Sequence, residues 1–107
     1  MLTKTSAQQL SSRGIRVNSV NPGPVRTNFM SAHGITGDNA DQLWDVIGAN
    51  LPLQFCPDPA DIANLVVFVA NNSLSRNMTG SILVSDTGRL VDVGSLRDIF
   101  KKVKKED

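Results

Sequence analysis

The 107 residues carry 11 basic and 10 acidic side chains, and the formal net charge of +1 gives no electrostatic basis for binding nucleic acid. Hydrophobic residues make up 40% and charged residues 20%, which is typical of a globular chain and not of a disordered one. The longest apolar run, residues 65–70, is far shorter than the ~20 residues of a membrane helix, and no signal-peptide pattern follows Met1. The single Cys56 excludes an internal disulfide, which fits a cytoplasmic protein.

The chain begins with a segment whose pattern is helical. Residues 2–12 contain neither Gly nor Pro, and Leu2, Ala7 and Leu10 lie on one face at helical spacing. Gly14 then stands where a glycine C-cap is expected. The segment therefore predicts a helix that ends just before Gly14.

A strand that stops abruptly is predicted next. Residues 15–20 are rich in β-branched side chains, but Pro22 and Pro24 cannot donate to a sheet ladder, so the strand is expected to end near Asn21. In open parallel α/β sheets, ligands bind beyond the carboxyl ends of the strands. The Asn-Pro-Gly-Pro stop is therefore predicted to be a loop that faces a ligand.

Two further helices are predicted in the middle of the chain. Asp38 or Asn39 can cap a helix over residues 40–49. A second helix is expected to begin at Pro59 after an Asp58 cap, and because it is apolar on most sides through residue 70, we expect a sheet face and a neighbouring subunit to bury it.

The C-terminal region predicts a last strand and then a basic tail. The strand covers residues 81–85 and leads into the sequence Asp-Thr-Gly at residues 86–88. In the tail, residues 91–107, a short helix starting at Ser95 has one apolar stripe and a lysine-rich opposite face. The two alternatives for this tail are ordinary packing and binding to an anionic membrane or a peptide-binding groove.

Four short segments occur in a characteristic order: GIRVNSVNPGPVRT at residues 14–27, CPDPADIA at 56–63, MTG at 78–80 and DTG at 86–88. In this order they resemble the C-terminal part of the classical short-chain dehydrogenase/reductase family, with its β-ketoacyl reductase-like and dehydrogenase-like members. The first segment matches every named position of the family's pattern. The chain departs from that pattern at Thr87, where the family usually has a glycine. The difference affects the local backbone, because threonine adopts positive φ less readily than glycine.

The resemblance implies an α/β fold, the C-terminal part of a doubly wound Rossmann-like parallel sheet. Residues 1–90 would form this part of an NAD(P)-binding domain, with residues 28–53 as the substrate-loop region and residues 91–107 as a tail. It also implies a homo-oligomer, either a dimer or a tetramer.

The resemblance further implies an NAD(P)-dependent oxidoreductase that transfers hydride between a cofactor and a small-molecule alcohol or carbonyl. Residue by residue, it places Pro22, Gly23, Val25 and Thr27 along the NAD or NADP cofactor, with Val25 acting through its backbone and Thr27 through its hydroxyl. The apolar substrate pocket would be shaped by Phe29, Met30, Leu43, Trp44 and Ile47. The alternative for Trp44 is that it only anchors the core.

The sequence lacks residues that the family uses for its chemistry. The chain contains no tyrosine, whereas the family's chemistry uses a Tyr hydroxyl as the proton donor and a Lys one helical turn later. No glycine-rich turn that would seat a pyrophosphate follows a strand. No catalytic residue is therefore assigned within this chain, and we expect a C-terminal portion of a longer enzyme that is inactive alone.

Two other classes of function stay open at this point. The chain is alternatively a non-catalytic interaction or dimerisation piece, because the apolar faces of its two predicted strands lack neighbours. A remote alternative is an aspartic protease, since residues 82–88 resemble the apolar strand and Asp-Thr-Gly of the retroviral type. No metal site is predicted, because His33 has no second ligand at a suitable spacing; Arg16 and Arg26 are candidates for a cofactor phosphate, with an exposed strand position as the alternative for Arg16.

Overall fold

The computed structural model describes residues 1–90, and the predicted basic tail of residues 91–107 lies outside the described residues. The chain divides into two compact units. The first, here called the strand unit, comprises Met1–Pro22 and Ala60–Ser85. The second, here called the loop unit, comprises Gly23–Pro59 and, among the described residues, residues 86–90.

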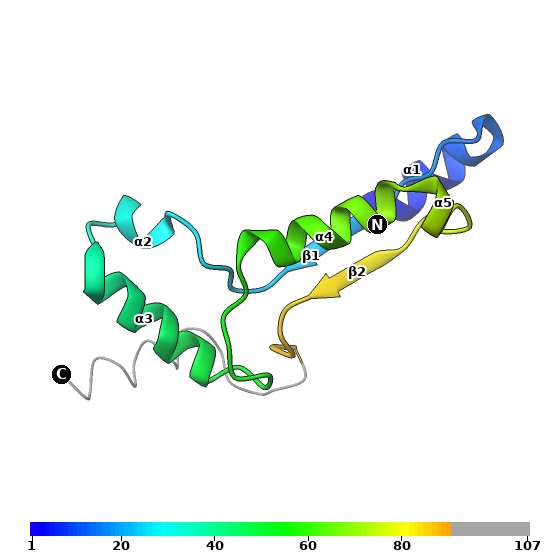
Figure 1. Ribbon diagram of the computed structural model, residues 1–107. Coiled ribbons are helices and arrows are strands. Elements are labelled where there is room, and N and C mark those ends of the chain that lie inside the picture. Colours follow the sequence, from blue (N-terminus) through cyan, green and yellow to red (C-terminus); the bar gives the residue numbers. More distant parts are fainter. Residues whose placement is uncertain (91–107) are drawn as a thin grey trace. The chain divides into compact units, whose positions relative to one another are not determined.

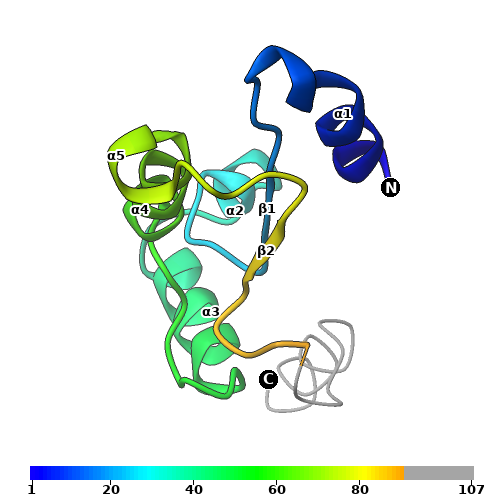
Figure 2. The same ribbon diagram turned by 90° about the vertical axis from the view of Figure 1, so that its right-hand side faces the viewer.

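A parallel pair of strands forms the centre of the strand unit (Figure 1). Strand β1 (Ser19–Pro22) pairs with β2 (Ile82–Ser85), so that Pro22, the last residue of β1, lies opposite Ser85, the last residue of β2. Parallel strands require a long crossover connection, and this one contains α4 (Pro59–Ala70) and α5 (Asn72–Ser75). Within the strand unit, α1 (Leu2–Leu10) and α4 lie on opposite sides of the two strands (Figure 2).

The first helix ends as predicted. Helix α1 continues into a 3₁₀ turn, η1 (Ser11–Arg13), and Gly14 follows at a φ of +71°. A side chain added at Gly14 would meet open space, so the left-handed backbone alone explains the glycine there.

Strand β1 starts later than predicted, at Ser19 and not at residue 15, although it ends where expected. Side chains replace the ladder in front of it: the Val17 N–H donates to Thr79 Oγ1 at 3.1 Å, and the Ser81 N–H donates to Asn18 Oδ1 at 3.0 Å. These hydroxyl and amide oxygens take the place of two strand carbonyls, although the Val17 carbonyl still accepts the Gly80 N–H at 2.7 Å. The β-branched segment therefore forms a regular strand only from Ser19 onward.

The loop unit is built on α2 (Phe29–Ala32) and α3 (Gly37–Ala49). The predicted Asp38 or Asn39 cap is wrong, because α3 already begins at Gly37, after Thr36 in an extended conformation. Asp38 instead lies in the first turn of α3, where its negative charge is favourable beside the helix dipole. Met30, Trp44, Ile47 and Cys56 form a buried cluster in this unit, and Leu51 is buried as well.

Helix α4 begins at Pro59 as predicted, and the part of the chain that the structure describes does not bury it; burial by a neighbouring subunit stays a prediction. No residue of α4 is buried, and Val67 is 64% exposed. A two-stranded sheet offers too little surface to cover a helix that is apolar all round. Among residues 1–90, no helix is both long and apolar enough to cross a membrane.

The turn after β2 contains a strained threonine. Asp86 stabilises this turn, because its two carboxylate oxygens accept the N–H groups of Gly88 and Leu90, each at 2.9 Å. Thr87 between them has a φ of +58°, which is unfavourable for a β-branched side chain. Position 87 therefore has a left-handed backbone that favours glycine, and Thr87 adopts it at a cost in conformational free energy.

We expect Thr87→Gly to stabilise the loop unit by about 0.5–1 kcal/mol, because the strain relieved exceeds the extra freedom that glycine adds to the unfolded chain. Urea unfolding followed by the fluorescence of Trp44, the only tryptophan, measures this change. Thr36→Gly is the matched control, since Thr36 has a φ of −131° and glycine relieves no strain there. An equal or lower midpoint for Thr87→Gly than for the unaltered chain would contradict the interpretation.

Candidate functional site

The loop that follows β1 begins with a glycine that leaves no room for a side chain. A Cβ atom built on Gly23 would lie 2.8 Å from the Asp86 Cβ and 3.0 Å from the Asp86 Cα. Gly23 follows the last residue of β1, and Asp86 follows the last residue of β2. The glycine of the Asn-Pro-Gly-Pro stop is therefore required by the close approach of these two loop starts.

The rest of this loop is held by the segment that precedes α4. The Arg26 N–H donates to the Pro57 carbonyl at 2.9 Å, and the Cys56 Sγ approaches the Pro24 carbonyl at 3.6 Å. Between these two anchors, neither the N–H nor the C=O of Val25 makes a hydrogen bond within residues 1–90. The backbone of Val25 is thus available to a ligand while its neighbours are fixed.

Thr27 closes the loop at the start of α2. Its side chain is exposed, and its Oγ1 accepts the N–H of Phe29 at 3.3 Å. The hydroxyl hydrogen of Thr27 is therefore left to donate to another group. Pro22 ends β1, and Gly23, Val25 and Thr27 lie in the loop that follows; the role of these residues in binding a cofactor stays a prediction.

Four of the five predicted substrate-pocket residues pack together in the loop unit, and the fifth, Phe29, is exposed. Met30, Trp44 and Ile47 are buried together, and Leu43 packs against them. Phe29 is 53% exposed, with its ring 4.3 Å from that of His33 by centroids. In this structure the apolar face of α3 is a packed core, in agreement with an anchoring role for Trp44, and the role of this face as a pocket wall stays a prediction.

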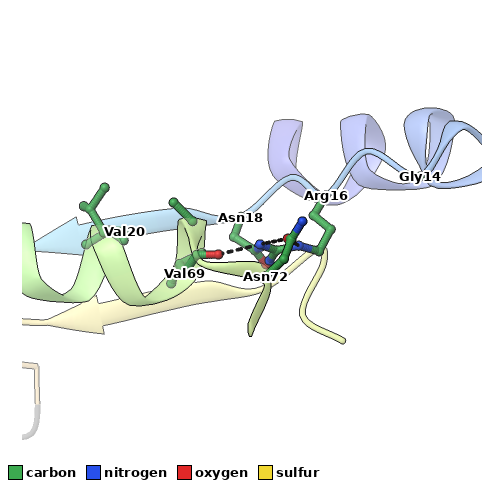
Figure 3. Close-up of a pocket in the computed structure, with 8 residues that line it drawn as sticks. Gly14, Arg16, Asn18, Val20, Val69 and Asn72 are labelled. Atoms are coloured by element: carbon green, nitrogen blue, oxygen red, sulfur yellow. Dashed lines mark hydrogen bonds between the residues drawn. The ribbon is translucent and has the colours of Figure 1, made fainter. Parts of the chain in front are cut away.

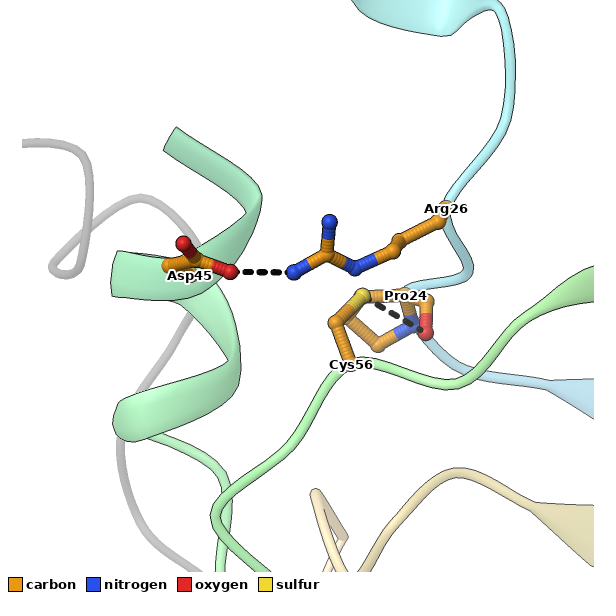
Figure 4. Close-up of polar contacts among 4 residues, drawn as sticks. All are labelled: Pro24, Arg26, Asp45 and Cys56. Carbon is orange, nitrogen blue, oxygen red and sulfur yellow. Dashed lines mark hydrogen bonds and ion pairs between the residues drawn. The ribbon is translucent and has the colours of Figure 1, made fainter. Parts of the chain in front are cut away.

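Cys56 and the pair of Arg26 and Asp45 were not singled out as a group by the sequence. Arg26 forms an ion pair with Asp45 of α3, and the Cys56 thiol lies beside them (Figure 4). Burial raises the pKa of the Cys56 thiol above its ordinary value. The positive charge of Arg26 lowers this pKa by less than burial raises it, and the negative charge of Asp58 raises it further. The thiol is therefore protonated at neutral pH, which is the opposite of an activated nucleophile.

The guanidinium group of Arg16 is hydrogen-bonded to other residues of the strand unit. Its Nη2 donates to the Val69 carbonyl and to Asn72 Oδ1, each at 2.8 Å, and its Nη1 donates to the Met78 carbonyl at 3.1 Å. Arg16 lines an open groove of about 640 Å³ between β1 and α4, together with Val20 (Figure 3). The expectation of an exposed strand residue is wrong: Arg16 precedes β1, is half-buried, and ties the last turn of α4 to the segment before β2.

The described residues hold no cluster of three or more His, Cys, Asp or Glu side chains suited to a metal ion.

A family model described as Enoyl-(Acyl carrier protein) reductase matches residues 1–89. Relatives include an uncharacterized oxidoreductase of Mycobacterium bovis, 33% identical over 82% of this chain and 33% of the relative. Another is the 3-oxoacyl-[acyl-carrier-protein] reductase of Staphylococcus epidermidis, 38% identical over 77% of this chain and 31% of the relative. The chain spans about a third of the length of these curated relatives.

Solved structures give the same result. A short-chain dehydrogenase/reductase from Caenorhabditis elegans, crystallised with cofactor, has a TM-score of 0.78 at 32% identity over 87% of this chain and 35% of that one. A small-chain dehydrogenase in complex with NADPH has a TM-score of 0.69 at 30% identity over 85% of this chain and 38% of that one. The chain belongs to the short-chain dehydrogenase/reductase family, and the predicted fold class, part of a Rossmann-like parallel α/β sheet, is confirmed.

Replacing Gly23 by alanine is expected to destabilise the loop unit by about 1–3 kcal/mol, because the new methyl group overlaps Asp86. Urea unfolding monitored by Trp44 fluorescence measures the loss. In an Asp86→Gly background the penalty should shrink, since the Cβ that the methyl group meets is absent. A Gly23→Ala variant as stable as the unaltered chain would contradict the close approach.

Arg16→Met should destabilise the strand unit by about 1–3 kcal/mol, because it leaves the Val69 and Met78 carbonyls without their charged donor. Unfolding followed by circular dichroism at 222 nm reports on the helices involved. Arg13→Met is the control, since Arg13 is exposed in η1. Equal losses for the two variants would show that Arg16 has no special structural role.

Proposed function

We propose that this chain is the C-terminal portion of an NAD(P)-dependent short-chain oxidoreductase that interconverts an alcohol and a carbonyl. The observation that carries the proposal is the shared end of the parallel pair, where Pro22 lies opposite Ser85 and the Pro-Gly loop leaves β1. Ligands of open α/β sheets bind beyond such carboxyl ends. Family membership supports the same function, as do two similar solved structures, one with cofactor and one in complex with NADPH.

In this proposal the loop forms one wall of the cofactor site. Gly23 keeps the backbone close to Asp86, Val25 offers a free N–H and C=O, and Thr27 offers a hydroxyl proton. The cofactor, when bound, supplies the hydride. The residues of this chain bind and orient, and the apolar face of α3 with Phe29 and Met30 would shape the pocket for a small alcohol or carbonyl.

We further propose that the 107-residue chain is inactive by itself. It has no tyrosine to protonate the carbonyl oxygen, and no glycine-rich turn to hold a pyrophosphate. Catalytic residues would come from another segment of the whole enzyme. The assembly of that enzyme as a homo-oligomer and its place in the cytoplasm stay predictions.

A second candidate function is a non-catalytic interaction piece. It is favoured by the apolar side chains that the strand unit leaves in contact with solvent, which are Val66 at 48%, Val67 at 64% and Val84 at 49% exposure. Parallel sheets are normally covered on both faces, so this surface has the composition of a contact surface. This function differs from the first by requiring no cofactor.

The aspartic-protease alternative finds no support. Both carboxylate oxygens of Asp86 accept backbone N–H groups of the turn that follows β2. An aspartate used in this way stabilises a turn. Family membership accounts for the Asp-Thr-Gly segment without it.

A chimera tests the proposed function. Joined to the preceding two-thirds of the Staphylococcus epidermidis 3-oxoacyl-[acyl-carrier-protein] reductase, this chain should restore NADPH binding and reduction of a carbonyl substrate. The isolated chain should show no saturable increase in NADH or NADPH fluorescence.

Within the chimera, Gly23→Val should weaken cofactor binding at least about tenfold, because the side chain displaces the loop. Thr3→Val, in α1, is the matched control. A folded chimera that binds no cofactor would refute the proposal, and saturable cofactor binding by the isolated chain would refute its inactivity.

A further inference from the structure

We propose that the ion pair between Arg26 and Asp45 is a latch that holds α3 against the Pro-Gly loop, which makes Arg26 a positioning residue for the apolar face of α3. The latch itself is a property of the loop unit alone. Its consequence for substrate, namely access to the pocket shaped by that face, rests on the proposed function.

Three links join three segments of the loop unit into a closed ring. The first joins α3 to the segment before α4: a Cβ built on Gly48 would lie 2.7 Å from the Cys56 nitrogen, so helix and segment are in close contact. The second joins that segment to the loop, through the Arg26 N–H on the Pro57 carbonyl at 2.9 Å. The third joins the loop back to α3, through the side chains of Arg26 and Asp45 (Figure 4).

The third link is the one that can open. Gly48, Cys56 and Pro57 are buried, whereas the side chains of Arg26 and Asp45 are 33% and 70% exposed. Ion pairs in such positions contribute little free energy and are screened by salt. Opening the pair therefore frees the side chain of Arg26 and uncovers the Cys56 thiol beside it, while the Gly48 contact and the hydrogen bond to Pro57 persist.

The chain leading into α3 is suited to such a movement. Gly34 and Gly37 have φ values of +81° and +61°, and a side chain built on either one would meet nothing. Glycines tolerate large changes of φ and ψ, which is what a hinge requires. Arg26 also lies between Val25 and Thr27, so the latch connects the loop proposed to hold the cofactor with the helix proposed to cover the substrate.

Two single-copy residues report on the latch in the full 107-residue chain. Cys56 is the only cysteine and is 7% exposed, and Trp44 is the only tryptophan and precedes Asp45 in α3. We expect Asp45→Asn to increase the rate of Cys56 alkylation by iodoacetamide about two- to five-fold, the change in open population that loss of a surface ion pair produces. Quenching of Trp44 by acrylamide should increase in parallel.

The rates are compared on the plateau of the pH profile, where every accessible Cys56 is ionised, because Arg26 also lowers the pKa of this thiol. Asp41→Asn, on the same helix and exposed, is the matched control and should leave both signals unchanged. Salt at 0.5 M should accelerate the unaltered chain and not Asp45→Asn. The charge-reversed double variant, Arg26→Asp with Asp45→Arg, should return to the slow plateau rate.

Four results would overturn the latch: equal plateau rates for Asp45→Asn and the unaltered chain, an equal effect of Asp41→Asn, a Cys56 that reacts in the unaltered chain as fast as in urea, or a fall in the urea midpoint that accounts for the whole change. None of these measurements uses a cofactor. A latch that fails therefore leaves the chimera's activity unaffected, and a chimera that fails leaves the Cys56 rates as measured.

Discussion

The parallel pairing of β1 (Ser19–Pro22) with β2 (Ile82–Ser85) is the constraint on which the strand unit depends. Two parallel strands cannot be joined by a tight turn, so the chain must return along the sheet through a crossover, and α4 lies in that connection. The same pairing brings both carboxyl ends to one edge. A single register therefore explains why a helix is required here and why two loops start at the same edge.

Arg16 and Gly23 serve this arrangement from the two ends of β1. Before the strand, the guanidinium group of Arg16 binds the Val69 carbonyl in the last turn of α4, where a cation is favoured by the helix dipole. After the strand, Gly23 allows the backbone to pass within side-chain contact of Asp86. One residue secures the crossover and the other permits the loop, so the family motif has a structural role at both ends of β1.

Much of this architecture was predictable because it depends on local chemistry. Gly14 and Pro59 predicted a helix end and a helix start correctly, since a left-handed C-cap and a first helical position each favour one residue type. The start of β1 was not predictable, because the hydroxyl of Thr79, more than 60 positions away, replaces a ladder bond at Val17. The link between Arg26 and Asp45 was missed for the same reason: no local signal pairs residues whose meeting depends on how α3 is placed.

The exposed apolar face of α4 shows what the pattern of a sequence does and does not encode. Its residues are apolar all round, which is the pattern of a helix covered on most sides, yet Val67 is 64% exposed within the described residues. Burial patterns are selected in the complete protein, whereas a structure of one chain contains only the contacts that this chain makes. The relatives are about three times as long as this chain. Within residues 1–90, the exposed apolar face of α4 therefore has the composition of a surface that packs against other protein.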